Sequence, residues 1–269
     1  MSVRNVVERC ARNLRFRRRL PREFGARVIW TSPDARLRYL RPGRAAFDRE
    51  LLQFVSRFIT AGQVVYDVGA NVGEFAIAAC HFTGPQGAVL AIEPDPFLCA
   101  LLHRTIAEPG NAGLPLEALC AAIAEKDGLS AFHIASRGRA SNALAGHGMP
   151  TMGGTRGQFM APVFAIDTIA QAWRAPDFIK IDVEGAEVRA LEGARQTLLR
   201  HRPLVLVEVT AMQNRIGEFF KQSNYRLFAQ TADGELVGIS QCAFNTLAVP
   251  AEKVPTMKKR WPRAHKHPL

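Results

Sequence analysis

Apolar and polar residues alternate along the chain in blocks that predict strands and helices in turn. Several short apolar runs, rich in Val and Ile and bounded by turn residues, are typical of buried strands. Between them, apolar residues recur every three or four positions, which is the spacing of a helix with one buried face. The strands are expected at residues 64–68, 88–92, 116–123, 163–167, 178–183 and 204–209, and the helices at residues 47–59, 75–82, 97–106 and 188–199.

This alternation favours one α/β domain. Parallel strands need helical crossovers, so the pattern predicts a mostly parallel sheet with helices on both faces. A final helix near residues 216–220 and a terminal antiparallel pair, residues 225–230 and 246–249, extend the domain. The sequence therefore predicts a Rossmann-like fold.

Weaker signals lie outside these elements. Residues 1–27 are rich in arginine and are expected to be irregular, whereas residues 27–30 and 37–40 are short β-like stretches. Residues 129–135 are predicted as the returning strand of a hairpin. Residues 136–160 hold many Gly, Ser, Arg and Met residues and predict a long loop. Such loops are functional lids or disordered insertions, and both interpretations stay open.

The positive charge is concentrated at the two ends of the chain. The net charge is +11, but residues 1–44 hold thirteen arginines against three acidic residues, and residues 252–269 hold six Lys or Arg against one glutamate. We therefore expect a basic N-terminal extension over residues 1–45, one domain over residues 46–250 and a basic C-terminal tail over residues 251–269. Such ends are typical of solvated tails or of contacts with an anionic surface such as nucleic acid, lipid or acidic glycan.

Cysteine usage and hydropathy favour a reducing, cytoplasmic compartment. The five cysteines are odd in number and include no Cys-x-x-Cys pair, which argues against a disulfide framework and a zinc site. No apolar run approaches the roughly 20 residues that span a bilayer. No apolar core follows the basic N-terminal residues, as a secretory signal would require. The sequence thus predicts a cytoplasmic protein without a transmembrane segment.

A glycine turn follows the first core strand, at the edge where α/β sheets bind their ligands. Within Asp67–Gly73, two glycines allow a tight turn and a close approach of the backbone to a ligand. The next strand ends at Glu93, 20 residues after the turn, where an acid accepts hydrogen bonds from ribose hydroxyls. The Gly-x-x-x-Gly spacing lacks the third glycine of a pyrophosphate loop, and Asp67 suits the cationic methionine end of S-adenosylmethionine. These features favour S-adenosylmethionine over NAD.

A second cluster of charges lies where a later strand leaves the sheet. Lys180, Asp182 and Glu184 occupy alternating positions after an apolar start. Three charges there are costly to bury unless they are paired or functional. A structural Lys180–Asp182 pair and a catalytic cluster both fit this pattern.

These motifs closely resemble those of the FkbM-type methyltransferases, and the run Phe178–Gly185 is highly specific to that family. The resemblance spans about Leu37 to Pro250, without the basic ends. It implies a class I methyltransferase fold with a mostly parallel seven-stranded sheet, and S-adenosylmethionine as methyl donor. It also implies O-methylation of a hydroxyl on a sugar, glycan or secondary metabolite. The resembling segments are Asp67–Gly73, Glu93–Pro96, Asp167–Ile169, Asp177–Glu187 and Pro203–Glu208.

The candidate site residues follow from these motifs. A hydroxyl needs a base to take its proton, and Glu184 is the expected proton acceptor, with His147 of the long loop as a rival base. Asp182, paired with Lys180, is expected to act as a positioning group. The acceptor is expected to enter beneath the 136–160 loop, and the adenine to lie near Ala121. The cofactor-binding residues are expected to be Asp67, Gly69, Ala70, Asn71, Gly73, Glu93, Pro94, Ala122, Ile123 and Asp182.

The chain also offers residues for metal binding and for other functions. No metal is predicted, although Asp167, Asp182, Glu184 and Glu208 could converge on a magnesium-like ion. The basic ends keep a nucleic-acid methyltransferase as an alternative, but the chain lacks the Asn/Asp-Pro-Pro-aromatic run that holds a flipped base. A non-catalytic cofactor-binding Rossmann protein is the other alternative.

Overall fold

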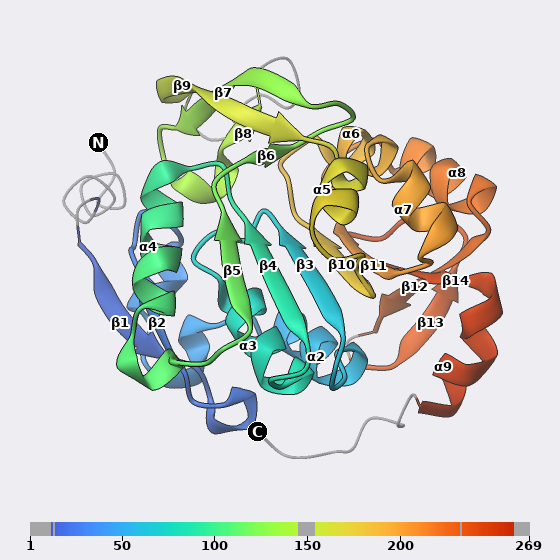
Figure 1. The fold of residues 1–269 in the computed structure, drawn as a ribbon, viewed down its shortest axis with the longest axis horizontal. Helices are drawn as coiled ribbons and strands as arrows, with labels where there is room; N and C mark the ends of the chain where they lie inside the picture. Colours follow the sequence, from blue (N-terminus) through green and yellow to red (C-terminus); the bar gives the residue numbers. More distant parts are fainter. Residues whose placement is uncertain (1–11, 13, 145–153, 232, 261–269) are drawn as a thin grey trace.

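An eight-stranded sheet forms the centre of the molecule (Figure 1). The computed structural model describes residues 12, 14–144, 154–231 and 233–260. Five neighbouring strands are parallel, and antiparallel pairs join the three strands beyond them. In spatial order the strands are β13 (Leu236–Ile239), β12 (Tyr225–Gln230), β14 (Asn245–Pro250), β11 (Leu204–Glu208), β10 (Phe178–Ile181), β3 (Val64–Val68), β4 (Ala88–Ile92) and β5 (Leu116–Leu119).

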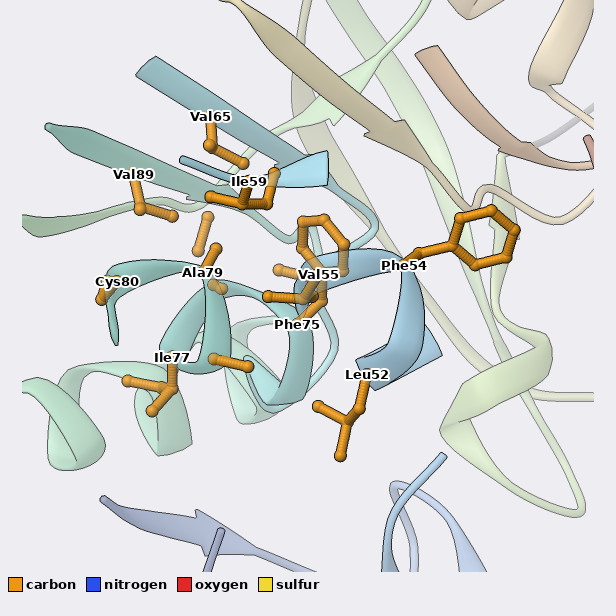
Figure 2. Packing of buried hydrophobic residues seen from close by; sticks show 14 of the residues in the cluster. Leu52, Phe54, Val55, Ile59, Val65, Phe75, Ile77, Ala79, Cys80 and Val89 are labelled. Carbon is orange, nitrogen blue, oxygen red and sulfur yellow. The ribbon is translucent and has the colours of Figure 1, made fainter. Parts of the chain in front are cut away.

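Helices cover both faces of this sheet, because successive strand residues point to opposite sides. Val65 and Val89 belong to one apolar core and Tyr66 to the other. Figure 2 shows Val65 and Val89 of the strands and Phe75 of the adjacent helix among the side chains of the first core. The first core contains residues of α2 (Arg49–Phe58), α3 (Glu74–Thr83) and α4 (Pro96–Ile106), and the second contains residues of α5 (Ile166–Ala172), α6 (Glu187–Glu192), α7 (Arg195–Arg200) and α8 (Gln213–Gln222).

A second sheet lies beyond the carboxyl end of the central one, where the arrowhead of β5 points in Figure 1. Its two central strands, β7 and β9, pair antiparallel. The short strands β6 and β8 form its edges, β6 beside β9 and β8 beside β7. The polypeptide around β8 is thereby held above the ends of the central strands. The strands are β6 (Ala122–Ile123), β7 (Gly128–Ala135), β8 (Ala143–Leu144) and β9 (Thr155–Phe164).

The arginine-rich N-terminal segment packs onto the domain. Strands β1 (Phe16–Arg19) and β2 (Val28–Thr31) pair antiparallel, and the Trp30 amide donates to Thr105 Oγ1 of α4 at 2.8 Å. Leu20 and Ile29 are buried in the first core. The expectation of an irregular, solvated segment is therefore wrong for these residues, because β2 packs against α4 and Ile29 and Thr31 are buried.

Short helical turns and one C-terminal helix complete the fold. The turn η2 (Leu37–Leu40) replaces the β-like stretch predicted there, and the buried Tyr39 anchors it. An apolar run of four residues does not distinguish a strand from a helical turn. The other elements are η1 (Arg22–Phe24), η3 (Gly43–Ala46), η4 (Pro109–Asn111), η5 (Arg139–Ser141), η6 (Ala251–Lys253) and α9 (Val254–Arg260).

The Rossmann-like α/β fold is confirmed, with four corrections to its elements. The sheet has eight strands and not seven, because β13 forms a hairpin with β12 after a turn at Gly234. The predicted strand 116–123 divides into β5 and β6, which join different sheets. The predicted strand 163–167 ends at Phe164, and α5 begins at Ile166. Residues 155–160 belong to β9 and not to a loop.

None of the described helices is long and apolar enough to cross a membrane.

Candidate functional site

A cleft opens at the carboxyl ends of β3, β4 and β10. It encloses about 620 Å³ of space, counting the part that is open to solvent. Clefts of a few hundred Å³ are the usual size for cofactor sites, and this edge of an α/β sheet is their usual place. We call it the cofactor cleft. Its walls include Gly69, Asn71, Glu93, Pro94, Ala121, Ala122, Ile123, Asp182 and Glu184.

The glycine turn forms one wall of the cofactor cleft. Gly69 has a φ of +74°, and a Cβ there would lie 1.8 Å from the carbonyl oxygen of Asp182. The glycine is therefore needed for contact between two segments of the protein itself. Gly73 has a φ of +84° and begins α3 against Leu102, away from the cleft. Ala70 lies between them and is buried.

Glu93 lies at the end of β4 with only 5% of its surface exposed. Its carboxylate accepts hydrogen bonds from the amide of Asn71 at 2.8 Å and from the amide of Asp95 at 2.9 Å. Burial raises the pKa of Glu93 to about 8, although the two amide donors oppose this shift. Each oxygen keeps a second lone pair for a hydroxyl in the cleft.

The opposite end of the cleft is apolar. Ala121, Ala122 and Ile123 follow β5, and all three are buried. Phe132 of β7 and Leu144 of β8 also line the cleft, and they pack in one apolar cluster with Ala122. This apolar end, which we call the apolar slot, suits an aromatic ring.

A buried chain of charges runs beneath the glycine turn. Lys180 Nζ lies 3.0 Å from Asp67 Oδ1 and 3.4 Å from Asp182 Oδ2, and it also donates to the Gly69 carbonyl at 3.3 Å. Asp67 is fully buried and accepts a bond from the Ala76 amide, so it does not border the cleft. Its predicted partnership with the cationic end of the cofactor is replaced by its ion pair with Lys180.

A second cavity of about 1020 Å³, again counting open space, adjoins the cofactor cleft. The two share Arg36, Ala140 and Glu184 as wall residues. We call it the second cavity. Glu184 and Glu208 both face it, and among the described residues no hydrogen bond reaches either carboxylate.

Burial raises the pKa of Glu184 and of Glu208, two of the acidic residues that line the second cavity. Glu184 has a pKa of about 7, because it is desolvated and lies near the carboxylates of Asp182, Glu208 and Glu187. Glu208 also has a pKa of about 7, through burial and the nearby Asp182. A group that titrates near neutrality is suited to accept a proton during a reaction.

Two buried aspartates bind the polypeptide around β8, residues 139–144, which borders the cofactor cleft and which we call its roof. Asp34 Oδ2 accepts from Arg139 Nε at 2.7 Å and from Arg156 Nη2 at 2.6 Å. Asp95 Oδ2 accepts from Arg139 Nη1 at 2.5 Å and from Asn142 Nδ2 at 2.7 Å. We call these five residues the aspartate clasp. It joins the N-terminal segment, the turn before α4 and the polypeptide on both sides of β8.

The predicted site residues come together only in part. Gly69, Asn71, Glu93, Pro94, Ala122, Ile123, Asp182 and Glu184 border the cofactor cleft, whereas Asp67, Ala70 and Gly73 do not. His147 lies outside the described residues. Asp167 sits in α5, where its carboxylate accepts from the Thr197 amide at 2.7 Å and caps α7. It therefore does not join Asp182, Glu184 and Glu208, and the described residues contain no cluster of three His, Cys, Asp or Glu that could hold a metal.

Arg36 is the site residue that the sequence analysis missed. It comes from the basic segment before η2, and its Nη2 lies 3.3 Å from Asp182 Oδ2. Thirteen arginines crowd residues 1–44, so nothing in composition or spacing distinguishes this one. Arg139 and Asn142 were recognised only as members of a polar loop.

A family model described as the methyltransferase FkbM domain matches residues 67–230, which is more than half of the chain. No curated protein matches the chain.

Several solved structures are similar to the chain at low sequence identity. Methyltransferase FkbM from Methylobacillus flagellatus KT is 19% identical with a TM-score of 0.47, over 70% of this chain and 43% of that one. This chain thus spans less than half the length of that protein. Fibrillarin from Aeropyrum pernix, in complex with natively bound S-adenosyl-L-methionine, is 11% identical with a TM-score of 0.43, over 81% of this chain and 76% of that one. By its match to the family model, this chain belongs to the FkbM methyltransferase family.

Proposed function

We propose that the cofactor cleft binds S-adenosylmethionine and that the protein methylates a hydroxyl group of a sugar, glycan or secondary metabolite. Three features of the cleft support the cofactor. The slot beside Ala122 and Ile123 suits an adenine ring, Glu93 offers free lone pairs to ribose hydroxyls, and the glycine turn borders the cleft at the opposite side. When bound, S-adenosylmethionine supplies a methyl group on a positively charged sulfur.

The second cavity is the proposed acceptor site. It adjoins the cofactor cleft at Glu184 and is bordered by charged side chains from several segments, among them Arg38, Asp48 and Glu208. Phe244 stands at its edge with 58% of its surface exposed. A polar cavity with an exposed aromatic ring fits an acceptor that carries several hydroxyls and an apolar face.

One observation carries the proposed chemistry: Glu184 borders both the cofactor cleft and the second cavity. A hydroxyl oxygen becomes a good nucleophile only when a base takes its proton during the transfer. Glu184 would take that proton while the sulfur–methyl bond breaks and the hydroxyl oxygen gains the methyl group. Asp182, fixed by Lys180 and Arg36, holds the neighbouring backbone in place.

The test is methyl transfer from tritiated S-adenosylmethionine to a panel of methyl glycosides, polyols and amines. We expect label in hydroxyl acceptors. With the best acceptor, Glu184→Gln should slow single-turnover transfer roughly 10²–10⁴-fold while binding S-adenosylhomocysteine normally. The exposed Glu235→Gln should transfer at the parental rate.

The pH profile gives an independent readout. Because the ionised carboxylate is the active form, kcat/KM should rise with pH through about 7 and level off above it. Glu208→Gln removes a neighbouring negative charge and should move this rise to lower pH. Label in amines but not in hydroxyls, or a full rate in Glu184→Gln, would show that O-methylation with Glu184 as base is wrong.

A further inference from the structure

A small cavity continues the cofactor cleft beneath the N-terminal segment. It encloses about 260 Å³ and shares Arg36, Gly69, Asn71 and Asp182 with the cleft. It lies on the glycine-turn side, away from the apolar slot at Ala122. A cofactor whose adenine fills that slot therefore directs its amino-acid end toward this cavity. Such an end carries a carboxylate, which needs a donor or a cation.

The backbone of the glycine turn does not supply that donor. The amides of Gly69 and Ala70 both donate to the Ile92 carbonyl, at 2.9 and 3.0 Å. The amide of Asn71 donates to Glu93. The amides of Val72, Gly73 and Ala76 donate to Asn71 Oδ1, the Ala70 carbonyl and Asp67, respectively. The protein's own oxygens thus occupy these amides of the glycine turn and of the first turn of α3.

The lysine of the small cavity is occupied as well. Lys180 Nζ has three donors, and it has Asp67 Oδ1, the Gly69 carbonyl oxygen and Asp182 Oδ2 within 3.0–3.4 Å. Its ammonium is buried, with 7% of the side chain exposed. A ligand carboxylate would have to displace one of these partners.

Arg36 is the remaining cation in the lining of this cavity. Within the described residues its guanidinium makes one side-chain hydrogen bond, from Nη2 to Asp182 Oδ2 at 3.3 Å. A guanidinium has five N–H donors in a planar fork that matches a carboxylate. The side chain is 23% exposed and borders the small cavity, the cofactor cleft and the second cavity.

We propose that Arg36 binds the carboxylate of the methionine moiety of S-adenosylmethionine. The inference rests on the proposed cofactor site and adds to it a residue from outside the matched family domain, which begins at Asp67. The segment before η2 thus completes the cofactor site. The bond to Asp182 holds the guanidinium on the glycine-turn side of the cleft.

The experiment compares two ligands that differ by the carboxylate alone. They are S-adenosylhomocysteine and its decarboxylated analogue, S-adenosyl-3-thiopropylamine, each titrated calorimetrically into the full chain. The wild-type protein should bind S-adenosylhomocysteine roughly 10- to 100-fold more tightly, which is the usual effect of one charge-assisted pair. Arg36→Met should lose most of this preference, because it weakens only the ligand with a carboxylate. Arg36→Lys should keep part of it, and Arg44→Met, at an exposed pair with Glu23, should keep all of it.

The ratio of the two affinities is measured within one protein, so a partial loss of folding does not imitate the expected result. Equal weakening of both ligands in Arg36→Met, or an unchanged preference, would overturn the role of Arg36 while leaving the cofactor site standing. If Arg36→Met does not fold, Arg36→Lys decides: a preference as large as that of the wild-type protein overturns the role, because lysine lacks the planar fork of donors. If the wild-type protein binds neither ligand, the proposed cofactor itself is wrong.

Discussion

Glu93 holds its carboxyl group where solvent barely reaches it, and this makes stability depend on pH. Burial raises its pKa from 4.5 to about 8 in the folded protein. Between these values the folded chain keeps a proton that the unfolded chain releases. The free energy of unfolding should therefore fall as pH rises from about 5 to 8, with a slope of up to about 1.4 kcal/mol per pH unit from this residue.

Urea unfolding of the unliganded protein at pH 5, 6, 7 and 8 measures this slope. Glu93→Gln should flatten it, because the amide does not titrate. Glu184 and Glu208 contribute to the same window with raised pKa values, so some slope should persist. Glu218→Gln, at an exposed acid, serves as the matched control. A Glu93→Gln slope as steep as the parental one would contradict the buried, protonated carboxyl.

At the residue scale the sequence predicts which residues matter better than it predicts why. Gly69 was expected to make room for a ligand, but it makes room for the carbonyl of Asp182. Asp67 was expected at the cofactor, but Lys180 pairs with it below the turn. Both errors have one cause, because the contacts come from residues more than 100 positions away. Sequence spacing within one turn carries no information about them.

At the element scale the aspartate clasp decides how the roof of the cofactor cleft is held. Breaking a buried ion pair costs about 3–5 kcal/mol, since it leaves charges without partners. Asp34→Asn leaves the guanidinium groups of Arg139 and Arg156 without this carboxylate. We expect hydrogen exchange around Arg139 to accelerate at least about 10-fold, because its amide donates to the Asp34 carbonyl.

Exchange followed by mass spectrometry measures this effect peptide by peptide. Glu23→Gln breaks the Arg44 pair, whose side chains are 44% and 61% exposed, and should change exchange little. S-adenosylhomocysteine should also bind Asp34→Asn more weakly, because Arg139 and Asn142 border the cleft. Unchanged exchange in Asp34→Asn would mean that the strands β7 and β9 hold the roof without the clasp.

Elements were predictable where both faces of a strand are buried. The sequence predicts β3 and β4 with their observed limits, because a continuous apolar run needs no knowledge of the partner strands. It misses the first half of β9, in which most side chains are exposed. That half is held by backbone pairing to β7, which a side-chain pattern does not report. Its residue composition is typical of a loop, although its backbone hydrogen bonds are those of a strand.

At the scale of the whole molecule, the N-terminal segment belongs to the core and to the site. Its charge predicts an extension, but Leu20, Phe24, Ile29 and Tyr39 lie in the first core, and Arg36 borders the cofactor cleft. The many arginines dominate the composition of the segment, so the sequence pattern does not reveal its few apolar core residues. The fold of the central domain was therefore more predictable than the edges that complete it.

If the domain began at residue 46, residues 46–269 would fold without the segment that precedes them. Leu20, Phe24, Ile29 and Tyr39 are between 0% and 8% exposed and lie in the same core as α2 and α3. Each buried side chain of this size stabilises the fold by about 1.5–3 kcal/mol. Four of them together approach the whole net stability of an ordinary domain, which is about 5–15 kcal/mol. Residues 46–269 expressed alone should therefore show no cooperative thermal transition by circular dichroism.

Point variants separate lost packing from lost chain length. Ile29→Ala in the full chain should lower the free energy of unfolding by about 2–4 kcal/mol, since Ile29 is fully buried. Leu14→Ala, at a side chain that is 55% exposed, should change it by less than about 0.5 kcal/mol. If residues 46–269 unfold cooperatively at the parental temperature, the segment before residue 46 is an extension, as its charge suggests. The core contacts of Ile29 and Tyr39 would then add nothing that the domain requires, and Arg36 alone would tie the segment to function.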